Sequence, residues 1–310
     1  MKIIITGGLG HIGSQLLRDL PNLFDLTEII IIDSLTTQRY SSLFDLPKKT
    51  KYTFIQNDIR TLDYLNIERC TNANLLIHLA ATNDISSGKI TFPEIEDNNL
   101  GATIAAISLC EKFNIPIIFP SSTSVYTSTG MNILESEPLG TNGNIYSRCK
   151  AIEEDYINKF FKQGGNGVLF RLGTIHGISK GMRFHTAINK FCYQIAIGEP
   201  ISVWRSALNQ KRPYLSLQDL THAIYFVMSS NLFDNQTYNL ATKNYDLLEI
   251  LQILGHVTGK KVDYIIEDNE RMNSLDLHVS TEKFTKHGFV YSGSIESDIS
   301  STLKILGDLR

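Results

Sequence analysis

The sequence predicts an α/β protein with a doubly wound parallel sheet and a smaller α/β lobe. Short apolar runs, too short for helices, recur through the first half and alternate with segments of helical apolar spacing. Such runs are typical of strands buried on both faces of a parallel sheet. The chain has 310 residues, which is more than a single hydrophobic core usually includes. The alternation of strand-like and helix-like segments stops after residue 174. We therefore expect a sheet domain over 1–174, with 217–242 returning to it, and a second lobe from 175–216 and 243–310.

The first predicted strand, 2–6, runs directly into a glycine-rich turn followed by a helical pattern. The turn contains Gly7, Gly10, His11, Ile12 and Gly13. Glycines at this G-x-x-G-x-x-G spacing permit a tight turn and let the backbone approach a pyrophosphate at the helix N-terminus. A glycine-rich turn can also be a plain structural corner, so the motif alone does not establish a phosphate site.

The second strand, 28–32, ends in Asp33, twenty residues beyond Gly13. In the dinucleotide-binding (Rossmann) fold this position holds an acid that accepts hydrogen bonds from the adenosine ribose. The alternative is an aspartate that only caps a loop. We predict the ribose role, and we expect the Asp33 charge to favour free ribose hydroxyls over a 2′-phosphate, although Arg39 stands nearby.

Two further strand ends should reach the same edge of the sheet. After strand 52–56 come Asp58 and Ile59, which could meet an adenine; Asp58 could instead cap the following helix. The strand 75–81 ends in Leu79, Ala80 and Ala81, and the two alanines leave room for a cofactor. His78 lies inside that apolar run and is better explained as a core histidine.

The remaining elements follow in order. Residues 82–97 are polar and predict a loop over the site. We expect helices over 98–112, 144–161, 219–228, 247–258 and from 295 onward, and strands over 115–119, 168–171, 237–240 and near 262–264. The strand 237–240 should return to the main sheet. After strand 115–119, hydroxyl side chains cluster at Ser122, Thr123 and Ser124, where a polar turn or a site would lie.

Tyr146 and Lys150 stand four residues apart on the helix 144–161 and so share one of its faces. A phenol is a poor base at neutral pH, but a nearby ammonium favours its ionised form and lowers its pKa. Such a pair often occurs by chance. Together with the glycine turn, Asp33 and Ser122, it predicts removal of a proton from a secondary alcohol while hydride leaves its carbon.

Composition excludes several other classes. The chain is 42% apolar and 20% charged, and 29 basic against 32 acidic residues give a net charge of −3, so nothing favours a nucleic-acid partner. No apolar run approaches a membrane span and no signal peptide precedes the first strand, which predicts a cytoplasmic protein. The four cysteines lack metal-site or disulfide spacing and should be buried thiols, with no metal site.

At this point the chain resembles the extended short-chain dehydrogenase/reductase family, and within it the nucleotide-sugar epimerases of the UDP-glucose 4-epimerase kind. The resemblance covers nearly the full length through the segments 6–13, 57–60, 77–81, 98–101, 121–126, 146–150, 171–174 and 211–214. It implies NAD as cofactor in the sheet domain and a nucleotide-diphosphate sugar as substrate in the cleft between the two lobes. It also implies a homodimer in which the helices 98–112 and 144–161 pair with their copies.

The resemblance implies a role for each matching residue. Tyr146 is the base, Lys150 also binds the nicotinamide ribose, Ser122 orients the sugar hydroxyl, and Asn98 contacts the cofactor. Arg212 matches the arginine that grips the substrate pyrophosphate, although before Pro213 it could be a surface residue. We also expect substrate contacts from Thr123, Ser124, Thr174 and Asn189.

Departures from the family pattern bear on the substrate. Thr127, Thr174 and His176 replace a common glycine, asparagine and aromatic residue, so the sugar pocket should differ from that of the standard galactose enzyme. No carboxylic acid follows Ser122, unlike in the dehydratases. We therefore predict a 4-epimerase with a transient 4-keto intermediate. A C4 dehydrogenase or ketoreductase is the alternative, and a catalytically silent redox-sensing protein on the same fold is a third.

Overall fold

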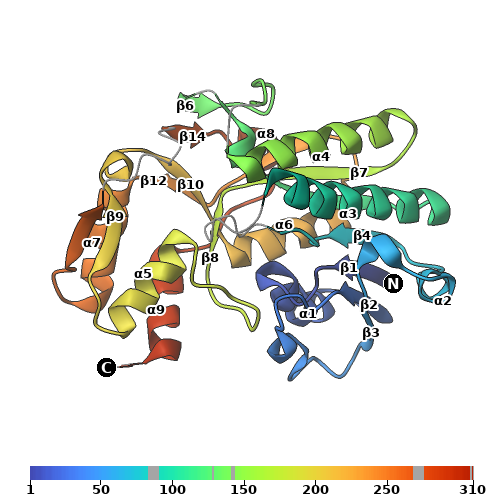
Figure 1. Ribbon diagram of the computed structural model, residues 1–310, viewed down its shortest axis with the longest axis horizontal. Coiled ribbons are helices and arrows are strands. Elements are labelled where there is room, and N and C mark those ends of the chain that lie inside the picture. The colour runs from blue at the N-terminus through green and yellow to red at the C-terminus, as the bar shows by residue number, and fades with distance from the viewer. Residues whose placement is uncertain (83–90, 128, 141–143, 268–275, 308, 310) are drawn as a thin grey trace.

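The computed structural model describes residues 1–82, 91–127, 129–140, 144–267, 276–307 and 309. Figure 1 shows a large sheet domain, drawn at the right, and a smaller lobe at the left that contains the C-terminal helix. Within the described residues no helix is long and apolar enough to cross a membrane. All four cysteines are free and buried, as expected.

The main sheet has seven parallel strands in the order β3-β2-β1-β4-β5-β7-β11, which confirms the Rossmann prediction. The strands are β1 (Lys2–Thr6), β2 (Glu28–Asp33), β3 (Lys51–Gln56), β4 (Leu75–His78), β5 (Ile117–Ser122), β7 (Gly167–Leu172) and β11 (Thr237–Leu240). As predicted, β11 returns to the sheet, where it pairs with β7.

Helices cover both faces of this sheet. Because side chains alternate along a strand, Ile3 and Ile5 of β1 enter one core and Ile4 enters the other. The first core includes residues of α1 (His11–Leu23) and α6 (Leu217–Ser230), and the second those of α3 (Phe92–Phe113) and α4 (Ile145–Lys162). Helices α3 and α4 lie side by side above the sheet in Figure 1.

Helix α3 begins at Phe92, so the predicted loop over 82–97 was wrong for its last six residues. Residues 83–90 of that loop lie outside the described part of the chain. Glu94 caps the helix, since its Oε2 accepts the Thr91 backbone N–H at 2.8 Å. Pro93 lies in the first turn, where its missing N–H costs nothing, and so does not break the helix.

The smaller lobe has its own core. Its strands β8 (Thr174–His176), β10 (Arg212–Ser216) and β12 (Lys243–Tyr245) form one sheet, and β9 (Ile201–Trp204) pairs with β13 (Tyr264–Glu267). Helices α5 (Ala187–Ala196), α7 (Leu247–Thr258) and α9 (Ile295–Leu306) pack around them. Strands β6 (Gly130–Ile133) and β14 (Leu277–Val279) also pair with each other, and neither was predicted from the sequence. Short helices α2 (Tyr64–Arg69) and α8 (Glu282–Thr285) complete the chain.

Candidate active site

A cavity of about 490 Å³ opens at the carboxyl ends of β1, β2, β3 and β4, where a parallel sheet usually holds its ligand. Twelve of the predicted cofactor residues line it. They are Gly7, Gly10, His11, Ile12, Gly13, Asp33, Asp58, Ile59, Leu79, Ala80, Ala81 and Asn98. Residues from the glycine turn after β1, from the ends of β2, β3 and β4, and from helix α3 thus meet in one cavity.

The glycine turn packs tightly against the end of β4. Gly7 has φ +62°, and a Cβ there would lie 2.6 Å from the Ala80 backbone nitrogen. A Cβ at Gly13 would lie 2.6 Å from the Cα of Gly8. Neither position has room for a side chain, because backbone atoms cannot move aside. The first turn of α1 therefore faces the cavity directly, in the arrangement that suits a phosphate group.

His11 offers this cavity a nitrogen without a protein partner. Its Nδ1 lies 2.8 Å from Ser179 Oγ, whereas its Nε2 is buried and has no hydrogen-bond partner among the described residues. Burial, assisted by the nearby charges of Arg39 and Arg183, lowers the pKa of His11 to about 3. The ring is therefore neutral, and when Ser179 donates to Nδ1, Nε2–H is left to donate to a ligand oxygen.

Asp33 links the turn to the end of β2. Its Oδ2 accepts the Leu9 N–H at 3.0 Å and its Oδ1 accepts the Leu35 N–H at 2.9 Å. Loop capping, the alternative considered from sequence, is therefore part of its role. Each carboxylate oxygen retains a lone pair that a ribose hydroxyl could use. Arg39, also on the cavity lining, donates to the Gly181 carbonyl at 2.9 Å.

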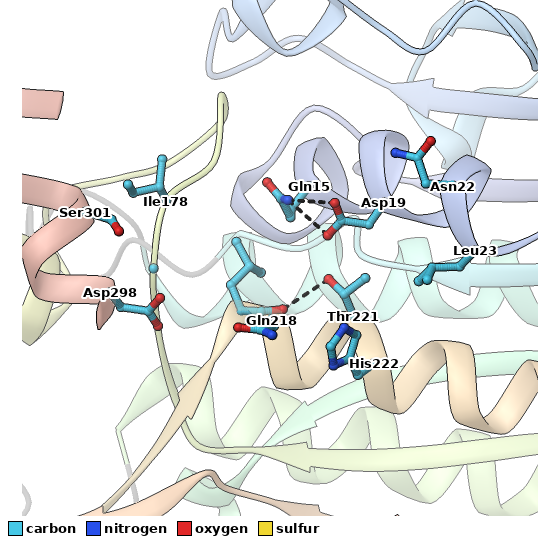
Figure 2. A pocket seen from close by; sticks show the side chains of 12 residues that line it. Gln15, Asp19, Asn22, Leu23, Ile178, Gln218, Thr221, His222, Asp298 and Ser301 are labelled. Atoms are coloured by element: carbon cyan, nitrogen blue, oxygen red, sulfur yellow. Dashed lines mark hydrogen bonds between the residues drawn. The ribbon is translucent and has the colours of Figure 1, made fainter. Parts of the chain in front are cut away.

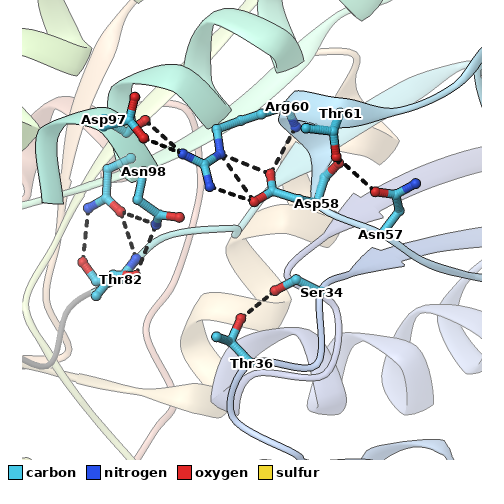
Figure 3. A network of polar contacts seen from close by, with 10 residues as sticks. Ser34, Thr36, Asn57, Asp58, Arg60, Thr61, Thr82, Asp97 and Asn98 are labelled. Atoms are coloured by element: carbon cyan, nitrogen blue, oxygen red, sulfur yellow. Dashed lines mark hydrogen bonds and ion pairs between the residues drawn. The ribbon is translucent and has the colours of Figure 1, made fainter. Parts of the chain in front are cut away.

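Asp58 is held by Arg60, as Figure 3 shows. The Arg60 Nη2 lies 2.7 Å from Asp58 Oδ2, and the Arg60 backbone N–H donates to Oδ1 at 2.9 Å. Hydrogen bonds from Arg60 lower the pKa of Asp58. Asp58 is therefore a capping residue, as the alternative reading of the sequence expected. It also lines the cavity, where its carboxylate could still contact an adenine.

Asn98 lines the same cavity from helix α3. Its Nδ2 donates to Thr82 Oγ1 and to Asn99 Oδ1, both at 2.9 Å (Figure 3). Asn99 is fully buried and fixes the backbone of Thr82, accepting its N–H at 2.7 Å. The sequence reasoning missed Asn99, although the Asn98-Asn99 doublet was visible.

Tyr146 and Lys150 lie on α4, as predicted, but they do not line the cavity. The Lys150 ammonium sits 5.9 Å from the centroid of the Tyr146 ring. It also forms a buried ion pair, 2.8 Å from Glu153 Oε2, with 4% of the lysine side chain and none of the glutamate side chain exposed. Glu153 was not anticipated from the sequence, where its spacing of three from Lys150 was the available signal.

The pKa of Tyr146 is raised, whereas the sequence predicted that the nearby ammonium would lower it. Burial raises the pKa of Tyr146, and this outweighs the opposing effect of the Lys150 ammonium. Burial also lowers the pKa of Lys150, but the interactions with Glu153, Tyr146 and Cys149, of which the charge of Glu153 contributes most, together outweigh burial and raise the pKa of Lys150. Lys150 is therefore charged, while Tyr146 in the protein alone is protonated at neutral pH.

The hydroxyl cluster follows β5. Ser122 Oγ accepts hydrogen bonds from the Ser124 hydroxyl at 2.9 Å and from the Ser124 backbone N–H at 3.2 Å. Both serines are partly exposed. Thr123 is 5% exposed, and its hydroxyl donates to the Leu172 carbonyl at 3.2 Å. The two serines can therefore offer hydroxyls to a ligand, whereas the Thr123 hydroxyl is committed to the protein.

Three predicted substrate residues come from the smaller lobe. Thr174 begins β8 and Arg212 begins the neighbouring β10, in a register that pairs Thr174 with Tyr214. Both side chains are partly exposed, and burial lowers the pKa of Arg212, which stays charged. Asn189 is fully buried, and its Nδ2 donates to the Arg183 carbonyl at 3.1 Å. Asn189 is therefore not accessible to a substrate in this conformation.

The smaller lobe also reaches the cavity. Arg183 and His185 line it, although neither was predicted as a cofactor residue. The segment before them is attached to the sheet domain, because the Gly181 N–H donates to Ser14 Oγ at 2.9 Å. Arg183 also lies close enough to Tyr146 to act on its charge. Arg183 thus lines the cavity and, against the larger effect of burial, also lowers the pKa of Tyr146 through its charge.

A second cavity of about 440 Å³ lies elsewhere, between α1, α6 and α9. Figure 2 shows that polar side chains line it, among them Gln15, Asp19 and His222, with Gln15 donating to Asp19. None of the predicted site residues lines this cavity. It is therefore separate from the candidate active site.

Comparison with known proteins places the chain. Two curated relatives are similar along most of their length. UDP-glucose 4-epimerase from Bacillus subtilis is 27% identical over 300 residues, covering 86% of this chain and 85% of that protein. ADP-L-glycero-D-manno-heptose-6-epimerase from Brachyspira hyodysenteriae is 26% identical over 274 residues, covering 85% of this chain and 83% of that protein.

A solved structure shares the fold. It is UDP-glucuronic acid 4-epimerase from Bacillus cereus with UDP-glucuronic acid and NAD, at a TM-score of 0.87, 19% identity and 99% coverage of both chains. A family model described as the NAD dependent epimerase/dehydratase family matches residues 3–241. The chain therefore belongs to the NAD-dependent epimerase/dehydratase family.

Proposed function

We propose that the protein is an NAD-dependent nucleotide-sugar 4-epimerase that works through a transient 4-keto sugar. The observation that carries this proposal is the Tyr146–Lys150 pair, in which the ammonium is buried and the tyrosine is partly exposed, together with the cavity that twelve predicted cofactor residues line. Arg183 lines that cavity, and its charge acts on Tyr146. A base next to a hydride acceptor is the minimum that oxidation of a secondary alcohol requires.

The cavity suits NAD in three ways. The turn at Gly7 and Gly13 admits only backbone, so that a pyrophosphate can approach the start of α1. His11 Nε2 is available to a phosphate oxygen, and Asp33 to the adenosine ribose. We assign the twelve lining residues described above to this cofactor, and Tyr146 and Lys150 to its nicotinamide ribose.

Bound NAD would accept the hydride from the sugar C4 and later return it. The protein's own residues handle the proton. Tyr146 is protonated in the protein alone, and the positive charge of a bound oxidised nicotinamide would favour its ionised form. The Tyr146 phenolate then takes the proton of the 4-hydroxyl as the C4–H bond breaks and the C4–O double bond forms. Ser122, whose own oxygen is held by Ser124, donates a hydrogen bond to the 4-oxygen. After the sugar turns over, Tyr146 returns the proton, and C4 has the inverted configuration.

Arg212 and Thr174 would hold the nucleotide part of the substrate. They lie on neighbouring strands of the smaller lobe and are partly exposed. A guanidinium offers two parallel donors to phosphate oxygens, which suits Arg212 to a pyrophosphate. Because this contact is distant from C4, it should contribute mainly to substrate binding.

A C4 dehydrogenase or ketoreductase is the second candidate. It is favoured by the departures from the family pattern at Thr127, Thr174 and His176, which should alter the sugar pocket. A substrate unable to turn over beside such residues would be oxidised or reduced in one direction. Dehydration is disfavoured because Ser122 is followed by Thr123 and Ser124, and neither can act as a carboxylic acid.

The test is to incubate the purified protein with UDP-, GDP-, dTDP- and ADP-activated sugars and to follow both nicotinamide absorbance and product NMR. Inversion at C4 without net change of the cofactor is the expected result. Accumulation of reduced cofactor with a 4-keto product would replace the epimerase by the dehydrogenase. Cofactor binding without conversion of any sugar would favour the catalytically silent alternative.

We also propose a homodimer, formed by the outer faces of α3 and α4. Ile104 on α3 is 41% exposed and Tyr156 on α4 is 37% exposed, and the two helices lie side by side. A monomeric mass by light scattering at micromolar concentration would exclude this assembly.

A further inference from the structure

Helix α4 presents two consecutive buried glutamates, each paired with a buried cation. Glu154 pairs with Arg171 of β7 at 2.8 Å and accepts the Ser121 hydroxyl of β5 at 2.6 Å. It therefore attaches the helix to the sheet. Among the described residues, Glu153 instead forms hydrogen bonds with Lys150, Thr103 and Cys149, none of which belongs to β5 or β7. The two neighbours thus have different tasks.

Glu153 anchors the Lys150 ammonium on the side of α3. Its Oε2 accepts one hydrogen bond from Lys150 Nζ at 2.8 Å and another from Thr103 Oγ1 at 3.0 Å. Thr103 in turn lies 3.4 Å from His78 Nε2, and His78 Nδ1 lies 2.8 Å from Thr6 Oγ1. A buried polar chain therefore runs from the lysine to the strand that enters the glycine turn.

The charges around Tyr146 show what Glu153 does electrostatically. Lys150 and Arg183 favour the ionised phenol, whereas Glu153 disfavours it. Two further titratable neighbours of the pair are neutral: burial lowers the pKa of His78 to about 3 and raises the pKa of Cys149 to about 12. Phe119 of β5, 5.0 Å from the ammonium, adds only a ring face. The charge of Glu96 on α3 also raises the pKa of Cys149.

We propose that Glu153 is a positioning residue for the Tyr146–Lys150 pair: its carboxylate anchors the ammonium and sets the pH range in which Tyr146 can act as a base. With Glu153 ionised, the buried ion pair of Lys150 and Glu153 has no net charge. Tyr146 therefore stays protonated until a further positive charge is bound nearby. This inference rests on the proposed role of Tyr146 as the base.

The sign of the expected effect follows from the charges. Replacing Glu153 with glutamine keeps an acceptor for Lys150 and Thr103 but removes the negative charge. The uncompensated ammonium then favours tyrosinate, so the ionisation of Tyr146 moves to lower pH. Lys150 loses the charge that stabilises its protonated form, so its ionisation also moves to lower pH. Both limbs of a bell-shaped rate profile should therefore shift in the same direction.

The test is an ultraviolet titration of tyrosinate in the cofactor-free protein, as the difference between each variant and the same variant with Tyr146→Phe. In Glu153→Gln the midpoint should fall by about one pH unit or more. The matched control is Asp155→Asn, which removes one exposed carboxylate of the same helix, paired with Lys159, and should leave the midpoint unchanged.

An unchanged or raised midpoint in folded Glu153→Gln would overturn the proposal and leave Glu153 a purely structural residue. Should Glu153→Gln fail to fold, Glu153→Asp decides. It keeps the charge but withdraws it by one methylene, so a smaller downward shift supports the proposal and no shift contradicts it. Because the titration needs neither cofactor nor sugar, its outcome is distinguishable from that of the sugar panel.

Discussion

The sheet domain and the smaller lobe place their candidate residues by different means. On the sheet side, the course of the backbone determines the contacts: three strand ends, one glycine turn and helix α3 bring twelve predicted residues to a single cavity. On the smaller lobe, the exposure of each individual side chain determines whether it could contact a substrate, and the predicted residues differ in this respect. Thr174 and Arg212 are partly exposed, whereas Asn189 is buried. Cofactor sites follow from topology, whereas substrate sites depend on local packing.

The largest expected effect lies where the two regions meet. Tyr146→Phe removes the proposed base while keeping the ring, and should lower kcat at least ~100-fold. Cofactor binding, which depends on the sheet side, should change little. Steady-state rates and a calorimetric titration with NAD measure the two effects separately. Near-native turnover in this variant would remove the proposed mechanism.

A smaller effect is expected from the substrate side. Arg212→Ala should raise KM by about 10-fold or more and change kcat much less, because a distant phosphate contact binds ground and transition states alike. Arg205→Ala, in the same lobe, is a control that removes a guanidinium with no proposed role. If kcat fell and KM did not change, Arg212 would belong to the reacting centre instead.

The smallest expected effect concerns cofactor choice on the sheet side. A 2′-phosphate near the Asp33 carboxylate would be repelled by about 1 kcal/mol or more, so NADP should bind roughly 10-fold more weakly than NAD. Arg39 lies on the same lining and opposes this preference. Calorimetric titration with both cofactors decides, and equal or tighter binding of NADP would refute the assignment of Asp33.

Most of the fold could be predicted because apolar runs and glycine spacing reflect the sheet directly. The start of α3 could not, since Pro93 and polar residues imitate a loop and only the Glu94 cap reveals the helix. The pair β6 and β14 joins residues about 145 positions apart, a contact that local patterns do not record.

The site was predicted where position alone determines contact, and missed where burial or tertiary pairing does. Spacing placed Tyr146 beside Lys150 but did not show that burial would raise the phenol's pKa. The role of Glu153 depends on Thr103 of another helix, fifty positions away in sequence. Arg183 follows a segment that Ser14, Arg39 and His11 attach to the sheet domain, contacts that local sequence patterns do not record.

The central claim is that C4 is oxidised and then reduced again within one bound complex. It is tested most directly with a substrate deuterated at C4, chosen from the sugar panel and incubated with the NAD-loaded protein in ordinary water. Because hydride leaves C4 and returns to C4 without mixing with solvent, the account predicts a C4-inverted product that keeps its deuterium. Inverted product in which solvent hydrogen has replaced the deuterium would contradict it.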